Sequence, residues 1–388
     1  MLATAKDELP LGVLRRCVRI VRCLTLRRFS LAWLVGLLLA ASPLSAQTDT
    51  FQPSFTVGAG IQGSFHRNQT SLPGTSQGTD DFTLDHARLY FSGDITNYIA
   101  AMVNTEYQSA NNSMQILDAV GQFHVSPKIN VWFGRFLPPS DRANLYGPFY
   151  ANEWAVFTDG IQDGYPFVFQ GRDNGVAYWG DFKAGTAKVK VSVGAFDGPS
   201  ATGTPNSNVI WATRVQVDFW DPEDGYYLNG TYYGDKNLLA IAGSTQVQSG
   251  RTATTADFLM ERKVSGGGAF TIESEYSRYN RLGGYNASYS RSEGGYGLVS
   301  FLIPREVGIG KFEALGKFAL AEFTGAPVGG PLNGSYRQKT TEADLGYIIK
   351  KFDARIIAFG KNTSFNAVQT NFWEAGVGLQ LQISKTFR

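Results

Sequence analysis

Long segments in which apolar and polar residues strictly alternate constrain this chain more than any other feature. The clearest one runs over twelve positions, 373–384, where every second residue from Trp373 to Ile383 is apolar. Alternation with a period of two residues is the signature of a β-strand whose two faces meet different surroundings. Similar segments occur at 99–107, 117–125, 189–195, 209–219, 239–247 and 341–350. The sequence therefore predicts an all-β fold.

Three features favour a membrane-spanning β-barrel over a soluble β-sandwich, whose strands would also alternate. The alternating segments are about ten residues long, which is the length that a tilted strand needs to cross a bilayer. Their polar faces carry many charges, which a packed apolar interior would not hold unpaired. Aromatic residues gather near segment ends, as they do in the girdles of membrane barrels; they include Phe219, Trp220, Tyr226, Tyr227, Tyr232, Tyr233, Phe372, Trp373 and Phe387.

Residues 1–46 have the layout of a secretory signal peptide. Six arginines between Arg15 and Arg28 are followed by an apolar stretch at 31–41, and the small residue Ala46 precedes the expected cut. The alternative is a single membrane anchor, for which the apolar stretch is too short. Beyond residue 46 there is no run of 18 apolar residues, which excludes a helical membrane bundle. We expect export, cleavage after Ala46 and one barrel domain over 47–388.

Removal of this segment changes the charge of the chain. The full sequence carries 35 basic and 33 acidic residues, and 1–46 contains seven of the basic and two of the acidic ones. The remaining chain then has 28 basic and 31 acidic residues, a balance that gives no reason to expect a nucleic-acid partner. Cys17 and Cys23 both lie in the removed segment. Disulfides, thiolate metal sites and cysteine nucleophiles are thereby excluded from the mature chain.

The spacing of the segments predicts sixteen strands. Single-chain bacterial barrels have an even number of strands, with short turns at the periplasmic end and longer loops outside. A simple count gives 17 segments, and it becomes 16 if 221–237 is one extended periplasmic turn with its tyrosines at the membrane interface. The longer connections then all fall on the outer side, at 66–81, 137–171, 198–208, 281–292 and 324–336.

Three stretches of this sequence stand out: FTLDHARLYFSG at 82–93, VWFGRFLPP at 131–139 and QGRDNGV at 170–176. They resemble the phosphate-selective porin O and P family of Gram-negative outer-membrane channels, and the resemblance extends loosely over 55–388. It implies a 16-stranded antiparallel barrel in outer-membrane lipid, a homotrimer, and a third external loop that folds inward as a constriction. The loop in that position here is 137–171.

The resemblance also implies passive diffusion of ions and small hydrophilic solutes, with no cofactor. Phosphate selectivity in the family depends on a cluster of basic residues at the constriction. Loop 137–171 contains only one basic residue, so we do not expect that selectivity to carry over. The residues predicted to line the pore or its constriction are His86, Arg88, Glu106, Asp118, Arg135, Asp141, Arg142, Glu153, Asp159, Asp163, Arg172 and Arg214.

The strand phase predicts the charge of the pore. With the apolar face outward, ten acidic residues and six basic residues of the strands point inward, which favours weak cation preference or none. The ten acidic residues are Glu106, Asp118, Asp218, Asp257, Glu261, Glu273, Glu275, Glu342, Asp344 and Glu374. The six basic residues are Arg88, Lys188, Lys190, Arg214, Lys263 and Lys350. A shift of the phase by one residue would exchange the two faces.

Evidence for an enzyme in the sequence is slight. The three histidines, His66, His86 and His124, lack the spacing of metal ligands, and no nucleophile and base are paired in a known pattern. The sequence thus predicts no catalytic residue and no metal. An outer-membrane barrel enzyme that hydrolyses lipid or glycan remains the alternative function.

Overall fold

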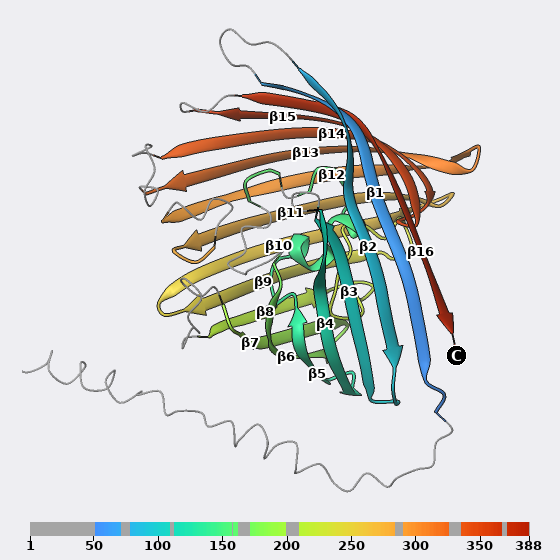
Figure 1. Ribbon diagram of the computed structural model, residues 1–388, viewed down its shortest axis with the longest axis vertical. Coiled ribbons are helices and arrows are strands. Elements are labelled where there is room, and N and C mark those ends of the chain that lie inside the picture. Colours follow the sequence, from blue (N-terminus) through green and yellow to red (C-terminus); the bar gives the residue numbers. More distant parts are fainter. Residues whose placement is uncertain are drawn as a thin grey trace, which may run out of the picture. The chain divides into compact units, whose positions relative to one another are not determined.

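A computed structural model describes residues 51–70, 78–108, 112–156, 158–161, 171–198, 209–283, 290–325, 335–366 and 371–387. The predicted signal segment 1–46 lies outside them. Within the described residues, sixteen antiparallel strands form one closed barrel in which every strand pairs with its neighbours in sequence (Figure 1). The predicted fold class and strand number are confirmed.

The strands are long enough to cross a bilayer, since all but β5 and β8 have ten residues or more. They are β1 (Ser54–Thr70), β2 (Thr79–Asp94), β3 (Ile99–Gln108), β4 (Ser113–Ser126), β5 (Ile129–Phe136), β6 (Asp173–Ala184), β7 (Ala187–Phe196), β8 (Ile210–Asp218), β9 (Leu238–Gln248), β10 (Arg251–Val264), β11 (Gly268–Asn280), β12 (Arg291–Val307), β13 (Gly310–Thr324), β14 (Tyr336–Lys350), β15 (Ala354–Phe365) and β16 (Phe372–Phe387).

The first and last strands close the barrel. Phe55 of β1 lies opposite Phe387 of β16, and the register continues without a break to Thr70 opposite Phe372. Closure leaves no strand edge unpaired. We call the end where β1 begins and β16 ends the terminal end, and the opposite end the loop end. The connections at the terminal end have two to four residues, except the long connection 219–237. The loop end carries the longer connections, but also the two-residue turn 249–250 between β9 and β10.

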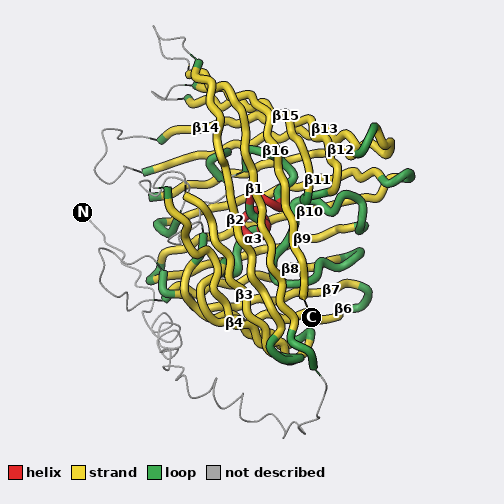
Figure 2. The backbone as a smooth tube through the Cα atoms, turned by 45° about the vertical axis from the view of Figure 1, so that its right-hand side comes forward, coloured by secondary structure: helices red, strands yellow, loops and turns green. Residues whose placement is uncertain are grey.

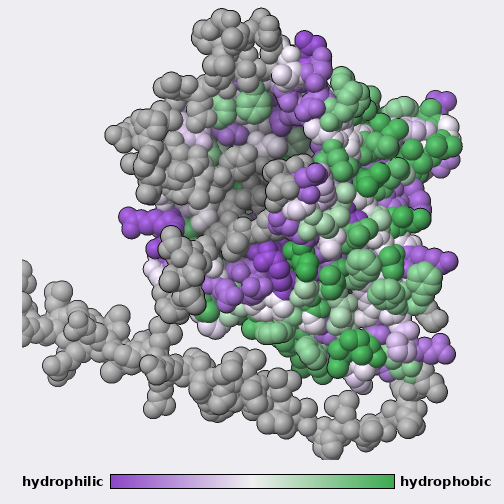
Figure 3. All heavy atoms as spheres, in the orientation of Figure 1, coloured by the Kyte–Doolittle hydropathy of each residue, from purple (hydrophilic) through white to green (hydrophobic). Residues whose placement is uncertain are grey.

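Inward and outward residues alternate along the strands, as the sequence predicted. In β14, Glu342 and Asp344 are buried inside the barrel, while Leu345 is 52% exposed on its outer face. In β8, Trp211 is likewise exposed, and Arg214 is buried. Figure 3 shows hydrophobic residues spread across the outer wall on the right of the view. Among the described residues, no helix has the length and apolar character needed to span a membrane.

The connection 219–237 between β8 and β9 contains no strand, as predicted. The expected position of its tyrosines is wrong, because they lie inside the barrel rather than at its rim. Tyr226 and Tyr233 are only 4% and 6% exposed. The Tyr226 ring packs on Trp132 with a centroid distance of 4.6 Å, and its hydroxyl donates to the Leu137 carbonyl at 2.8 Å. Inside the barrel the tyrosine ring gains an aromatic contact and its hydroxyl gains a hydrogen-bond acceptor, which favours this position over the barrel rim.

Candidate functional site

The described part of loop 137–171 lies within the ring of strands. It contains the short helix α3 (Arg142–Tyr146) and the 3-10 turn η2 (Pro148–Tyr150), and Figures 1 and 2 both show α3 inside the barrel. Asp141 starts the helix as its N-cap, since its side chain accepts a hydrogen bond from the Asn144 backbone N–H at 2.8 Å. Burial raises the pKa of Asp141. We call residues 137–161 the inner loop.

Hydrogen bonds attach the inner loop to the far wall. Tyr146 donates to Glu273 of β11 at 2.9 Å, and the Asn152 amide donates to Ser300 of β12 at 2.9 Å. Arg355 of β15 donates to the Ala151 carbonyl at 2.7 Å. Because these partners belong to strands opposite β5 and β6, the inner loop crosses the lumen rather than lining one side of it.

Two aromatic side chains of the inner loop pack against glycines of the wall. A Cβ atom added at Gly60 would lie 2.8 Å from the Phe149 ring, and one at Gly378 would lie 2.2 Å from the Trp154 ring. Only glycine permits so close an approach. Two further aromatic residues of loop 137–171, Phe157 and Phe167, lie outside the described residues.

The connection 219–237, which we call the inner turn, enters the barrel from the terminal end and meets the inner loop. The Leu228 N–H donates to the Leu145 carbonyl at 3.2 Å, and the Gly230 N–H donates to the Tyr150 carbonyl at 2.8 Å. Two chain segments that enter from opposite ends therefore share backbone hydrogen bonds inside the lumen. Nothing in the strand pattern predicted this contact.

A buried ion pair joins the same two segments. Arg142 of the inner loop donates to both carboxylate oxygens of Glu223 in the inner turn, at 2.9 and 2.5 Å, and both side chains are fully buried. Burial alone would raise the pKa of Glu223, but the Arg142 charge overcomes it and lowers the pKa to about 2. Asp257 of β10, which Arg214 contacts at 2.5 and 2.9 Å, lies 3.7 Å from Arg142. Arg142 and Arg214 are thus held by carboxylates.

The acidic residues predicted for the constriction do not point freely into the pore. Glu153 and Asp159 both contact Lys317 of β13, each at 2.9 Å, and Asp141 caps α3. The structure thus corrects the expectation that these carboxylates face the pore, because the wall supplies a cation that the sequence assignment had missed. Asp163 lies outside the described residues.

Four of the predicted strand residues form pairs on the wall made by β2, β3 and β4. Arg88 contacts Glu106, which also hydrogen-bonds with His86 at 2.8 Å. Asp118 accepts from the Asn104 amide at 2.9 Å. These side chains lie in the barrel interior.

Arg135 precedes loop 137–171 and Arg172 follows it. The Arg172 Nε lies 3.4 Å from Asp118 in the interior. Arg135 is not on the lumen side, because Trp132 and Phe136 set the inward phase of β5 and Arg135 shares the outward phase of Phe133. Its assignment to the pore lining is wrong.

The sequence analysis missed three inward cations, Lys317, Arg355 and Lys361. In β15 the inward positions also include Ile357 and Phe359, so its two faces do not differ clearly in polarity. Among the assigned bases, Lys350 is exposed at the terminal end beside Asp353. In the described residues as a whole, fifteen acidic and eight basic residues are buried. The interior therefore keeps an acidic excess, although the individual pairings differ from those expected.

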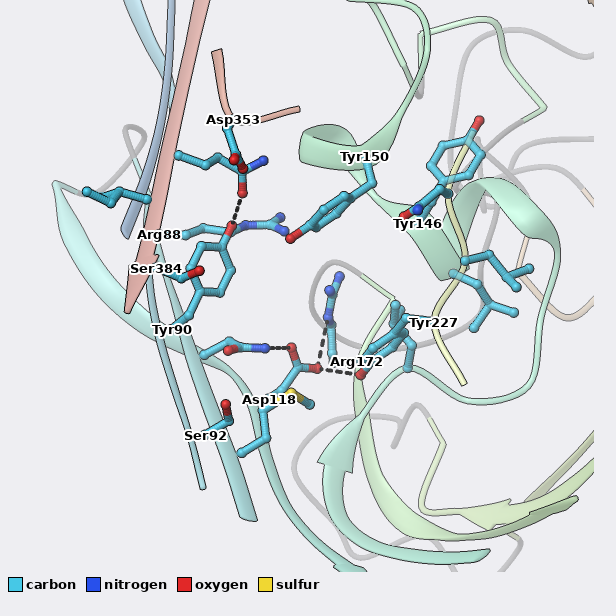
Figure 4. A pocket seen from close by; sticks show the side chains of 18 residues that line it. Arg88, Tyr90, Ser92, Asp118, Tyr146, Tyr150, Arg172, Tyr227, Asp353 and Ser384 are labelled. Carbon is cyan, nitrogen blue, oxygen red and sulfur yellow. Dashed lines mark hydrogen bonds and ion pairs between the residues drawn. The ribbon is translucent and has the colours of Figure 1, made fainter. Parts of the chain in front are cut away.

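A cavity of about 350 Å³ lies between the β2–β4 wall, β16, the inner loop and the inner turn (Figure 4). Figure 4 shows Arg172 and Tyr227 converging on Asp118, and the Arg88 guanidinium pointing toward Tyr150. Within the described residues, no group of three or more histidine, cysteine or acidic side chains is placed to hold a metal ion.

The barrel is similar to solved outer-membrane porins. An anion-selective porin from Comamonas acidovorans matches with a TM-score of 0.56 at 10% identity, over 86% of this chain and 100% of that one. The outer-membrane channel DcaP of Acinetobacter baumannii gives 0.54 at 13% identity, over 88% and 100%. The OmpF of Salmonella typhi, in complex with daunomycin, gives 0.53 at 12% identity, over 85% and 97%.

The barrel has the porin fold. At these identities the likeness concerns the fold alone. Scans of protein-family models and of curated proteins find no match. The O and P family suggested by the three sequence stretches therefore rests on those stretches.

Proposed function

We propose that this protein is a porin of the Gram-negative outer membrane, through which ions and small hydrophilic solutes diffuse passively. The observation that carries the proposal is the sorting of side chains across the wall of a closed barrel. Charged side chains fill the inside, while residues such as Trp211 and Leu345 are exposed outside. An apolar outer face suits lipid, and a charged lumen suits water and solutes.

The proposal includes the location and the assembly. The terminal end would face the periplasm, because short turns lie on that side in outer-membrane barrels. Export would remove 1–46, so the intact mass of protein purified from outer membranes should correspond to a chain that begins at Gln47. A mass that includes residues 1–46 would contradict the export step. A homotrimer is proposed from the O and P resemblance, and cross-linking in intact membranes tests it.

Phosphate selectivity is not part of the proposal. The two arginines of the cavity, Arg88 and Arg172, contact Glu106 and Asp118. A cluster that attracts phosphate needs cations whose charge is not already balanced by neighbouring carboxylates. The resemblance to the O and P family therefore supports the barrel, and the site geometry argues against the family's ligand.

Recordings of the pure protein in a planar lipid bilayer test the proposal against the alternative of a barrel enzyme. A porin gives stepwise increases in conductance as single molecules insert. An outer-membrane hydrolase inserts without current and releases product from lipid or glycan substrates. Silent insertion would overturn the proposal, and measurable hydrolysis would replace it with the enzyme.

A further inference from the structure

The cavity in Figure 4 differs from the rest of the lumen in its charge. Its lining contains two cations, Arg88 and Arg172, and two carboxylates, Asp118 and Asp353. The rest of the interior has an excess of acidic residues. Since Arg88 is also paired with Glu106, the cavity offers no net positive field to an anion. It also lacks the unopposed carboxylates that would hold a free cation.

Hydroxyl groups and amides dominate the remaining polar lining. Tyr90 and Ser92 of β2 and Ser384 of β16 face Tyr150 of the inner loop and Tyr227 of the inner turn. A hydroxyl both donates and accepts hydrogen bonds, and an amide offers one group of each kind. The amides come from Asn104, Asn229 and Gln382. Asn104 and Tyr227 also donate to Asp118, and Tyr90 donates to Gln382. This lining matches a solute whose own groups both donate and accept.

Aromatic surface is available beside these polar groups. Tyr150 remains 36% exposed although it lies within the barrel, and its ring meets the Phe352 ring edge to face at 5.4 Å. Leu137 and Leu145 add apolar lining. The volume of about 350 Å³ falls within the range of about 300–1,000 Å³ of sites that hold small organic molecules. A solute with a hydroxylated rim and C–H faces fits such a combination.

We propose that this cavity is a binding site for neutral polyhydroxylated solutes, such as monosaccharides and polyols, on their way through the barrel. This inference rests on the proposed porin function, because it names the class of solute that the barrel would conduct. The inner turn is part of the site, because Tyr227, Leu228 and Asn229 complete its lining. Binding has to be weak enough for release, as in any conducting pore.

The test uses the full-length barrel in a planar bilayer with potassium chloride, and D-glucose as the probe. Glucose in the millimolar range should interrupt the potassium current in proportion to its concentration, whereas equal concentrations of phosphate or choline should interrupt it far less. Tyr227→Phe removes a lining hydroxyl and should raise the half-blocking glucose concentration about two- to tenfold. Tyr276→Phe is the matched control, since Tyr276 is 50% exposed outside the barrel, and it should change nothing.

Ser92→Trp provides a second variant, which fills the cavity without removing a hydrogen bond that the structure assigns to Ser92. It should slow glucose uptake in a liposome-swelling assay more than it lowers potassium conductance. Full conductance with no effect of glucose up to 0.5 M, or stronger block by phosphate or choline, would overturn this inference while the porin function stands. Absence of conductance would instead overturn the porin function.

Discussion

Arg142 and Glu223 make the ion pair on which the contact between the inner loop and the inner turn depends most. The pKa of Glu223 lies at about 2, below its ordinary value of 4.5. A carboxyl group whose pKa is lower in the folded state stabilises that state above its unfolded pKa, and this contribution disappears as the pH falls through the folded value. The pair should thus hold at pH 7 and weaken between about pH 4.5 and pH 2.

Glu223→Gln tests this at constant pH. Loss of one partner of a buried pair costs about 3–5 kcal/mol, and Arg142 would keep only Asp257 at 3.7 Å, so the inner turn should detach from the inner loop. We expect larger and noisier single-channel currents at pH 7, like those expected of the unmodified protein as the pH falls from about 4.5 toward 2. Glu322→Gln, which removes an exposed partner of Arg337, is the control. Identical recordings for Glu223→Gln and the unmodified protein would contradict this role.

The inner loop is the element that narrows the lumen most directly. It crosses from β5 to the wall formed by β11–β15, with contacts to Glu273, Ser300 and Arg355. Excision of 142–165 should therefore raise the single-channel conductance while the barrel still assembles. The measurement needs a control for folding, such as the heat-dependent shift of folded barrels in gel electrophoresis. An unchanged conductance with a folded barrel would show that the current passes elsewhere.

The last strand is the element that completes the barrel. Phe387 lies opposite Phe55, so β16 closes the sheet with its final residues. Deletion of Phe387 and Arg388 should reduce the amount of folded barrel recovered from outer membranes. Phe301→Ala, on the outer face of β12, removes an exposed aromatic residue away from this seam and serves as the comparison. Equal recovery of the two variants would show that Phe387 has no special role in barrel assembly.

Alternation predicted the strands well and the interior poorly, for a physical reason. In β8 and β14 the outer face is apolar and the inner face is charged, so the phase can be read directly from the sequence. In β15 the inner face also carries Ile357 and Phe359, because the inner loop covers it, and Arg355 was missed. The tyrosines of the inner turn resemble membrane-interface residues in the sequence, because the residues that bury them are also distant in the chain. Which partner buries an aromatic ring is a long-range property that local sequence does not contain.

The whole barrel should prefer cations weakly, because its described interior buries fifteen acidic residues against eight basic ones. A reversal potential measured across a potassium chloride gradient gives the sign of the preference, and low salt gives the clearest value because screening is weaker. Lys317→Gln removes the cation that Glu153 and Asp159 share and should increase the preference. Clear anion selectivity with block by phosphate would show that the basic site of the O and P family operates here.

The anchoring of the inner loop also has a consequence for biosynthesis. The carbonyl of Phe149 accepts a hydrogen bond from Gln380, which follows it by 231 positions in the chain. The inner loop is synthesised in the first half of the chain, but part of its binding surface forms only when β16 has been made. Until then the aromatic residues of the inner loop have no wall to cover them, and in the proposed export route a chaperone would have to shield them. A stalled or truncated chain would present these residues to proteases, so quality control of this protein can act on its interior before its surface has formed.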